Sequence, residues 1–177
     1  MSQGLFTALL ALTVVERLVE MGVSRRNVAW SLERGGREFG FGHFPAMVAL
    51  HAAFLVACGA EVWLLDRVFV PWLGVPMLVI ALGCQGLRWW VIRTLGPRWN
   101  TRVLVVPGLP RITAGPFRWL RHPNYAAVVV EGVALPLIHG AWISALGFSV
   151  LNAALLRVRI RVEEDALAWM VQQEAAS

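Results

Sequence analysis

Residues 115–125 read Gly-Pro-Phe-Arg-Trp-Leu-Arg-His-Pro-Asn-Tyr, and they gather two arginines, a histidine and a tyrosine in a largely apolar chain. A long hydrophobic run begins where this stretch ends. A second polar cluster, 157–165 (Arg-Val-Arg-Ile-Arg-Val-Glu-Glu-Asp), follows the last hydrophobic run. We expect the two clusters to meet at one face of a membrane and to form one binding site there.

The composition indicates a membrane protein. The chain has 177 residues, of which 58% are hydrophobic, whereas soluble domains are about 45–50% apolar. The formal net charge is +5, but the basic residues cluster between hydrophobic runs. This pattern suits lipid headgroups and not nucleic acid. We therefore expect membrane lipids, and no nucleic acid, among the partners.

Hydrophobic runs of suitable length recur along the chain. A bilayer core of about 30 Å needs about 20 helical residues. The last apolar region, 125–156, is too long for one span, and His139-Gly140 divides it into a hairpin of two shorter helices. In a single domain of residues 1–177, the predicted spans are about 5–23, 44–65, 70–92, 125–138 and 141–156.

The arginine distribution supports a topology of five spans. With five spans, segments 24–43 and 93–122 and the tail from 157 lie on the same side, and together they hold thirteen of the 16 basic residues. The opposite loops hold only Arg67. Cytoplasmic segments of membrane proteins carry such an excess of basic residues. We therefore place the N-terminus outside and the C-terminus in the cytoplasm.

The connection 93–124 is rich in proline and cannot form one continuous helix. Its apolar residues, among them Trp99 and Phe117, favour an ordered cap over a floppy linker. The predicted fold class is therefore all-α integral membrane protein, with about five transmembrane helices. A cytoplasmic cap, formed by the 93–124 loop and the C-terminal helix, would cover them.

Several other features carry less information. The glycine-rich segment 35–42 lacks the preceding strand and the Lys-Ser/Thr of a phosphate loop, so we interpret it as loop flexibility. His43 and His51 lack partners at metal-binding spacing, and no metal site is expected. Glu131 lies deep in a span and needs a partner. We predict Arg88, either as a structural pair or beside a substrate cavity.

Each polar cluster has a chemical and a structural interpretation. Pro123 suits the first turn of a helix, whose free N–H groups can bind a carboxylate or phosphate. Arg121 and His122 would add charge and donors, although contact with headgroups alone would also explain them. Arg159 and Glu163 are four residues apart and share a helix face. Alone, that cluster is typical of an amphipathic helix with surface ion pairs.

Together, the two clusters resemble the isoprenylcysteine carboxyl methyltransferase family, whose members are integral membrane enzymes that use S-adenosylmethionine. The resemblance covers about residues 88–167, and its site motifs lie in 109–125 and 157–167. The matching elements are Gly115-Pro116-Phe117, Arg121-His122-Pro123-Asn124-Tyr125 and Arg159-x3-Glu163-Glu164-x2-Leu167.

This resemblance implies roles for individual residues. Arg159 would face the methyl acceptor as the catalytic residue. Phe117 stands where the family often has Tyr, so a hydroxyl contact is lost there. The residues implied in binding S-adenosylmethionine are Ile112, Phe117, Arg121, His122, Pro123, Asn124, Tyr125, Glu163 and Glu164.

Residues 16–20, 26–27 and 151–153 also resemble a short bacterial subgroup of the family, which implies a bacterial plasma membrane. Some of its members methylate long-chain phenols or pyrones. The expected function is therefore methyl transfer to an oxygen of a lipophilic small molecule, such as a long-chain polyketide. The alternatives are isoprenylcysteine carboxyl methylation, an NADPH-dependent reductase like the membrane sterol reductases, and a non-enzymatic scaffold or transporter. No partner protein can be named from the sequence.

Overall fold

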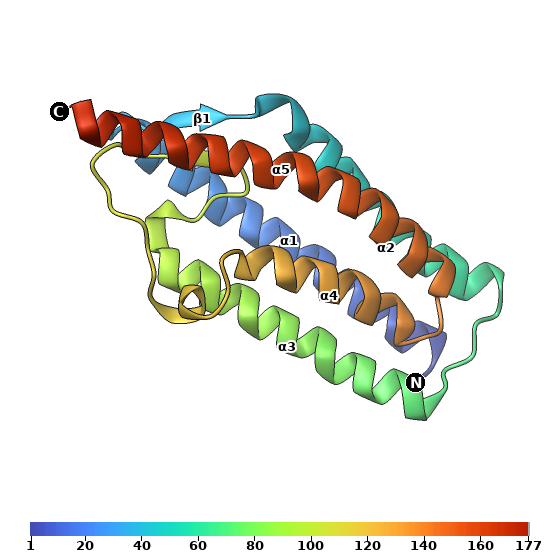
Figure 1. Cartoon of the computed structure of the whole chain (residues 1–177). Helices are drawn as coiled ribbons and strands as arrows, with labels where there is room; N and C mark the ends of the chain where they lie inside the picture. The colour runs from blue at the N-terminus through green and yellow to red at the C-terminus, as the bar shows by residue number, and fades with distance from the viewer. Residues whose placement is uncertain (177) are drawn as a thin grey trace.

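Five long helices lie side by side in the protein (Figure 1). The computed structural model describes residues 1–176, and the side chains of residues 1–172; residue 177 of the predicted domain lies outside this part. The predicted all-α class and the hairpin broken near His139-Gly140 are confirmed. The helices are α1 (Gln3–Leu32), α2 (Phe44–Leu64), α3 (Pro71–Leu95), α4 (Pro123–Leu137) and α5 (Trp142–Ala176).

Three of these helices, α2, α3 and α5, are long and apolar enough to cross a membrane. Helix α1 has 30 residues but carries several ionisable side chains. Helix α4 has 15 residues, which corresponds to a length of about 22 Å. The predicted spans 5–23 and 125–138 are thus confirmed as helices, while their crossing of the bilayer stays a prediction.

Helix α1 is longer than the hydrophobic pattern predicts, because it continues to Leu32 instead of ending near Val23. Arg25 and Arg26 therefore lie on the helix and not in a connecting loop. Helix α5 continues from the apolar run through the second polar cluster, as expected. The arginine-rich segments lie at one end of the bundle, opposite the N-terminus and the two short connections, 65–70 and 138–141 (Figure 1).

A small sheet at the arginine-rich end was not predicted. Strand β1 (Arg37–Phe39) pairs antiparallel with β2 (Val103–Val105), so that Glu38 lies opposite Leu104. The sheet ties the glycine-rich segment to the 93–124 connection. Three short 3-10 helices complete this end: η1 (Phe41–His43), η2 (Gly96–Arg98) and η3 (Gly115–Arg118).

Close packing, and not loop flexibility, explains two glycines of the 35–42 segment. A Cβ atom on Gly36 would lie 2.5 Å from the carbonyl oxygen of Ser31. Gly40 has a φ of +64°, and a Cβ there would lie 2.5 Å from Val162 of α5. At these two positions the interpretation as loop flexibility is therefore wrong: Gly36 and Gly40 allow the β1 region to pack against α1 and α5.

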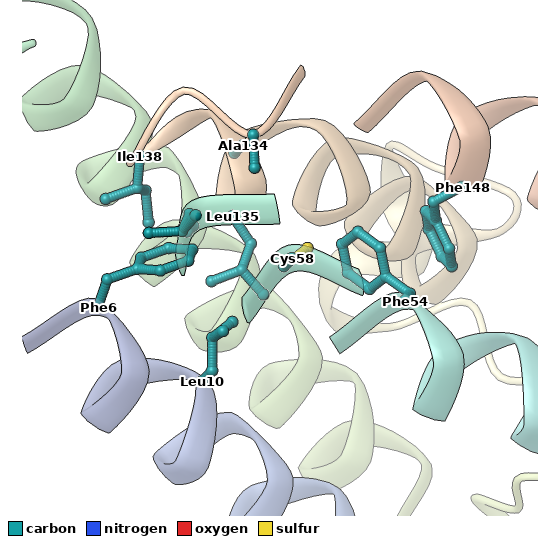
Figure 2. Close-up of a cluster of buried hydrophobic side chains, with 11 residues drawn as sticks. Phe6, Leu10, Phe54, Cys58, Ala134, Leu135, Ile138 and Phe148 are labelled. Carbon is teal, nitrogen blue, oxygen red and sulfur yellow. The ribbon is translucent and has the colours of Figure 1, made fainter. Parts of the chain in front are cut away.

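An apolar core occupies the end of the bundle opposite the sheet (Figure 2). It joins side chains of helices that are distant in sequence. These side chains are almost fully buried. The hydrophobic effect therefore holds the helices together mainly at this core. The labelled members are Phe6 and Leu10 of α1, Phe54 and Cys58 of α2, Ala134 and Leu135 of α4, Ile138, and Phe148 of α5.

Nearer the polar end, charged side chains connect α1 with α3 and α4. Arg88 Nε donates to Glu20 Oε1 at 2.9 Å, and Glu20 also accepts from Arg17 at 2.8 Å. Glu131 accepts from Arg17 at 3.1 Å and from Gln85 Nε2 at 2.8 Å. The predicted pairing of Arg88 with Glu131 is therefore wrong. Helix α1 carries both an arginine and a glutamate at this level. Glu131 pairs with Arg17 of α1, and Arg88 pairs with Glu20 of α1.

At the opposite end, Glu61 of α2 fixes the start of α5. Its carboxylate accepts from the backbone N–H and the hydroxyl of Ser144, both at 2.7 Å, and pairs with Arg67 at 2.9 Å. Free N–H groups at a helix start are stabilised by such a carboxylate. The position of α5 along the bundle is thus set by a contact with its neighbour.

We expect Glu20→Gln to destabilise the protein, because it leaves the guanidinium of Arg88, which is 7% exposed, without its carboxylate. Breaking a buried pair in this way costs about 3–5 kcal/mol. Thermal unfolding in detergent micelles, followed by tryptophan fluorescence, measures the loss. The matched control is Arg34→Ala, which removes an exposed pair with Glu33 and should change stability by less than about 1 kcal/mol. Equal midpoints for the two variants would contradict a supporting role for the charged network.

Candidate cofactor and acceptor site

Tyr125 joins the two polar clusters. It lies in the first turn of α4, which Pro123 opens, and its hydroxyl donates to the carboxylate of Glu163 on α5. The same hydroxyl oxygen accepts from Arg159 Nε at 3.0 Å. Because Arg159 and Glu163 lie one turn apart on α5, a single phenol can contact both. The structure thus brings the two clusters together at one end of the bundle.

The carboxylate of Glu163 has a second polar neighbour. Its Oε1 lies 3.6 Å from His122 Nδ1, and the His122 ring stacks on the ring of Tyr125 with an interplanar angle of 13°. Pro123 confines the backbone of the preceding residue to non-helical conformations, which keeps His122 just outside the helix. The Arg-His-Pro-Asn-Tyr stretch therefore presents an imidazole and a phenol to one carboxylate.

Arg159 is a buried cation without a carboxylate partner among the described side chains. The residue is 7% exposed, and its guanidinium also donates to the carbonyl of Thr101 at 2.7 Å and contacts the sulfur of Met47. These direct partners are neutral dipoles, and the carboxylate of Glu163 is linked to the guanidinium only through the Tyr125 hydroxyl. An anionic oxygen would be stabilised at such a site.

A cavity of about 210 Å³ opens beside these residues. Its wall is partly apolar and partly polar, and the polar part contains Tyr125, Arg159 and Glu163. The wall is built by the end of α3, segment 98–112, η3, the start of α4 and the polar half of α5. The lining residues include Val91, Leu95, Trp99, Asn100, Val103, Val106, Leu109, Ile112, Phe117, Arg121, His122, Pro123, Asn124, Leu167 and Met170.

Nearly all of the predicted site residues lie in this wall. The exception is Glu164, which lies outside it and pairs with Arg121 at 3.1 Å at the exposed rim. Ile112 and Phe117, which the resemblance implied in cofactor binding, contribute apolar surface. The predicted residues from both clusters therefore share one cavity.

Some lining residues were missed. Ser31 reaches the cavity from the end of α1, and Val103–Val106 reach it because β2 pairs with β1. No local motif marks them, since they arrive through the packing of distant segments. Asn100 follows Trp99, whose side chain is buried. An aromatic residue in this connection predicts an ordered segment, and that was the one sequence signal that pointed to Asn100.

Two amide oxygens in the wall have no donor. Asn100 Oδ1 and Asn124 Oδ1 are both buried without a hydrogen-bond partner. Buried polar atoms are normally satisfied, and exceptions are often found where a ligand binds. These two oxygens are therefore unsatisfied acceptors beneath the surface of the cavity wall.

A second hollow, of about 200 Å³, lies along α5 and reaches Val129 of α4. Val129 lies one turn beyond Tyr125, and Leu156 and Ile160 flank Arg159 in sequence. The hollow is mainly apolar, and neighbouring side chains such as Val130 and Leu151 are exposed. A lipophilic molecule could lie here with a polar end toward Arg159. The lining residues are Val129, Phe148, Ser149, Asn152, Ala153, Leu156, Arg157 and Ile160.

Comparison with known proteins agrees with this architecture. Residues 76–169 match the isoprenylcysteine carboxyl methyltransferase family, and this range contains both polar clusters. The uncharacterized protein YpbQ of Bacillus subtilis (strain 168) is 39% identical over 164 residues, which cover 92% of this chain and 96% of that protein.

A solved structure has the same fold. It is the eukaryotic intramembrane Ras methyltransferase, isoprenylcysteine carboxyl methyltransferase, with a TM-score of 0.58 and 20% identity. The match covers 75% of this chain and 48% of that enzyme, so this chain spans about half of the enzyme's length. Its membrane-spanning helices and the match over more than half of its length establish that the chain belongs to the isoprenylcysteine carboxyl methyltransferase family and is a membrane methyltransferase.

Proposed function

We propose that the protein transfers a methyl group from S-adenosylmethionine to an oxygen atom of a lipophilic acceptor that is dissolved in the membrane. The observation that carries the proposal is the position of Arg159. Its buried guanidinium, which contacts no carboxylate directly among the described side chains, lies in the wall of the cavity. The next residue, Ile160, lines the apolar hollow. A cofactor in the cavity and an acceptor in the hollow would both come close to this residue.

The residues of the cavity fit the cofactor. The aliphatic and aromatic wall around Trp99 and Phe117 would hold the adenine, and Glu163 would accept from the ribose hydroxyls. His122 and the free N–H groups at the start of α4 suit the amino acid end. When bound, the cofactor supplies an electrophilic methyl group on a sulfonium, so the protein's task is mainly to position the acceptor oxygen behind it.

Arg159 would act on the acceptor. A guanidinium beside the acceptor oxygen stabilises negative charge there, and it thereby favours loss of the proton from a phenol or enol. For a carboxylate acceptor the same group would orient an oxygen that is already charged. The contacts to Tyr125 and Thr101 hold the guanidinium in place before either molecule binds.

The apolar hollow favours a long-chain acceptor, such as a polyketide phenol. Its wall is aliphatic near Val129 and Leu156, and a chain in it would replace lipid. The cofactor would enter from the cytoplasm, at the arginine-rich end, since basic segments stay on that side. We place the N-terminus outside and the active site at the cytoplasmic face of a bacterial plasma membrane.

Isoprenylcysteine carboxyl methylation is the second candidate, because the matching family and the solved relative carry that activity in their names. A prenyl chain would fit the same apolar hollow, and its carboxylate would meet Arg159. The two candidates differ in the acceptor and not in the cofactor.

We expect the purified protein to bind S-adenosylhomocysteine and not NADPH, because the cavity combines apolar walls with Glu163 and His122, which lie within the range that matches the methyltransferase family. Isothermal titration in detergent micelles with each compound measures this. Binding of NADPH together with no binding of S-adenosylhomocysteine would overturn the proposal in favour of a reductase. Transfer of a labelled methyl group to a long-chain phenol or to farnesylcysteine then separates the two acceptor classes.

Arg159→Met should lower methyl transfer to the preferred acceptor by about 10²–10³-fold, the usual effect of removing a donor to a developing oxyanion. Affinity for S-adenosylhomocysteine should change much less, because Glu163 and the apolar wall remain. The matched control is Arg161→Met, which removes an exposed arginine two residues away and should keep normal activity. Full activity of the Arg159→Met variant would exclude a role for the guanidinium at the acceptor.

A further inference from the structure

We infer that Asn152 of α5 is a specificity-determining residue whose side-chain amide binds a second polar group of the acceptor; this rests on the proposed function. Asn152 lines the apolar hollow and is 4% exposed. The acceptor that fits is a lipophilic molecule with two oxygen atoms. One oxygen is methylated, and the other, a carbonyl or hydroxyl, lies deeper in the hydrocarbon and binds Asn152.

The amide of Asn152 is not used by the fold. Within the described part of the chain, no backbone group or side chain forms a hydrogen bond with it, whereas the nearby Ser149 donates its hydroxyl to the carbonyl of Ala145 at 2.7 Å. The amide atoms of Asn152 are also not among the fully enclosed polar atoms that lack a partner. The amide is therefore open to the hollow that the residue lines.

A free amide is costly in such surroundings. The neighbouring wall is mainly apolar, with Val129, Leu156 and Ile160 among its residues. An amide that is removed from water without a new partner loses its hydrogen bonds uncompensated, and polar groups at membrane depth usually face a partner or a cavity. A molecule that brings a hydrogen-bonding group to Asn152 would recover this loss.

Phe148 forms the end of the hollow one turn before Asn152. Its ring packs against Gly132 of α4, where a Cβ atom would lie 2.4 Å from the ring, and against Phe54 with ring centroids 4.1 Å apart. The side chain of Val129, also in the wall, is exposed. A long chain would therefore leave the hollow sideways into lipid, while the polar part of the acceptor stays between Phe148 and Arg159.

The spacing of Asn152 and Arg159 indicates where the second oxygen lies. The two residues are seven apart, which is about two turns and about 10 Å along α5. In the proposed function Arg159 contacts the reacting oxygen. Because each hydrogen bond takes up about 3 Å, the width of a ring would separate the two oxygens of an acceptor that reaches both residues.

This residue distinguishes between the two candidate acceptors. A prenyl chain is a hydrocarbon, and its thioether sulfur is only a weak acceptor. It would leave the amide of Asn152 without a partner, as lipid does. An oxygenated acceptor would satisfy the amide, so Asn152 favours such a molecule over a prenylcysteine.

Two acceptors that differ only in a carbonyl test the subsite: para-pentadecylphenol and para-hydroxyphenyl tetradecyl ketone. We expect Asn152→Leu to lower kcat/KM for the ketone about tenfold, the effect of one lost hydrogen bond, and to change kcat/KM for the alkylphenol by less than about twofold. Transfer of a labelled methyl group by the full-length protein in micelles measures both. Because the carbonyl also alters the acidity of the phenol, the ratio of the two kcat/KM values is compared between wild type and variant.

Ser149→Ala is the matched control. Its hydroxyl already has a partner in the protein, so this substitution should change the ratio by less than about twofold. A series measured on the wild type protects the test if Asn152→Leu fails to fold: when the carbonyl is moved along the chain, kcat/KM should be highest at one position.

An unchanged ratio in Asn152→Leu, or equal kcat/KM at every carbonyl position, would overturn the subsite and leave the proposed function intact. Methylation of farnesylcysteine alone would also overturn the subsite, while methyl transfer to a lipophilic acceptor stands. If the wild type methylates none of these acceptors, the proposed function fails and the subsite fails with it.

Discussion

The structure depends on the burial of opposite charges between α1, α3 and α4. An isolated ion at membrane depth is costly, and such groups face one another or a cavity. Here Arg17 contacts both Glu20 and Glu131, and Glu20 also holds Arg88. The Arg17–Glu131 contact links α1 to α4 and the Glu20–Arg88 contact links α1 to α3. The register of α1 against these neighbours is therefore specified by charge as well as by apolar packing.

This register also determines where the cavity forms. Val91, in the cavity wall, lies one turn beyond Arg88 on α3, and Ser31 lies at the far end of the helix that carries Arg17. The charge pairs fix α1 and α3 lengthwise against each other, and in this register the ends of both helices lie beside the small sheet. The site is therefore built on rigid elements, with Tyr125 connecting the two helices of the hairpin.

Much of the architecture could be predicted from the sequence, because hydrophobic length and proline are local signals. The hairpin near His139-Gly140 and the helical continuation of α5 through Arg159 and Glu163 both followed from them. The meeting of the two clusters needed one more step, the arginine distribution, which placed them at the same end. Their role in binding a cofactor stays a prediction.

What could not be predicted depends on distant contacts. Glu131 takes Arg17 and not Arg88, because the choice depends on how α1 rotates against α4. Strand β1 has three residues and exists only because Val103–Val105 lie beside it. Asn100 reaches the cavity through contacts of its neighbours with α1. None of these features produces a hydrophobic periodicity or a short motif in the sequence.

Helix α5 is continuous from Trp142 to Ala176, and its start is fixed by Glu61 at the opposite end of the bundle. Arg159 lies 17 residues along it, about 26 Å from the start at 1.5 Å per residue. This distance is close to the thickness of the hydrocarbon core, about 30 Å. With the start of α5 at one boundary of the hydrocarbon core, a helix of this length would place the guanidinium near the other boundary, between acyl chains and headgroups. Acceptors would be selected by the depth at which their oxygen floats, before any contact with their chemical groups.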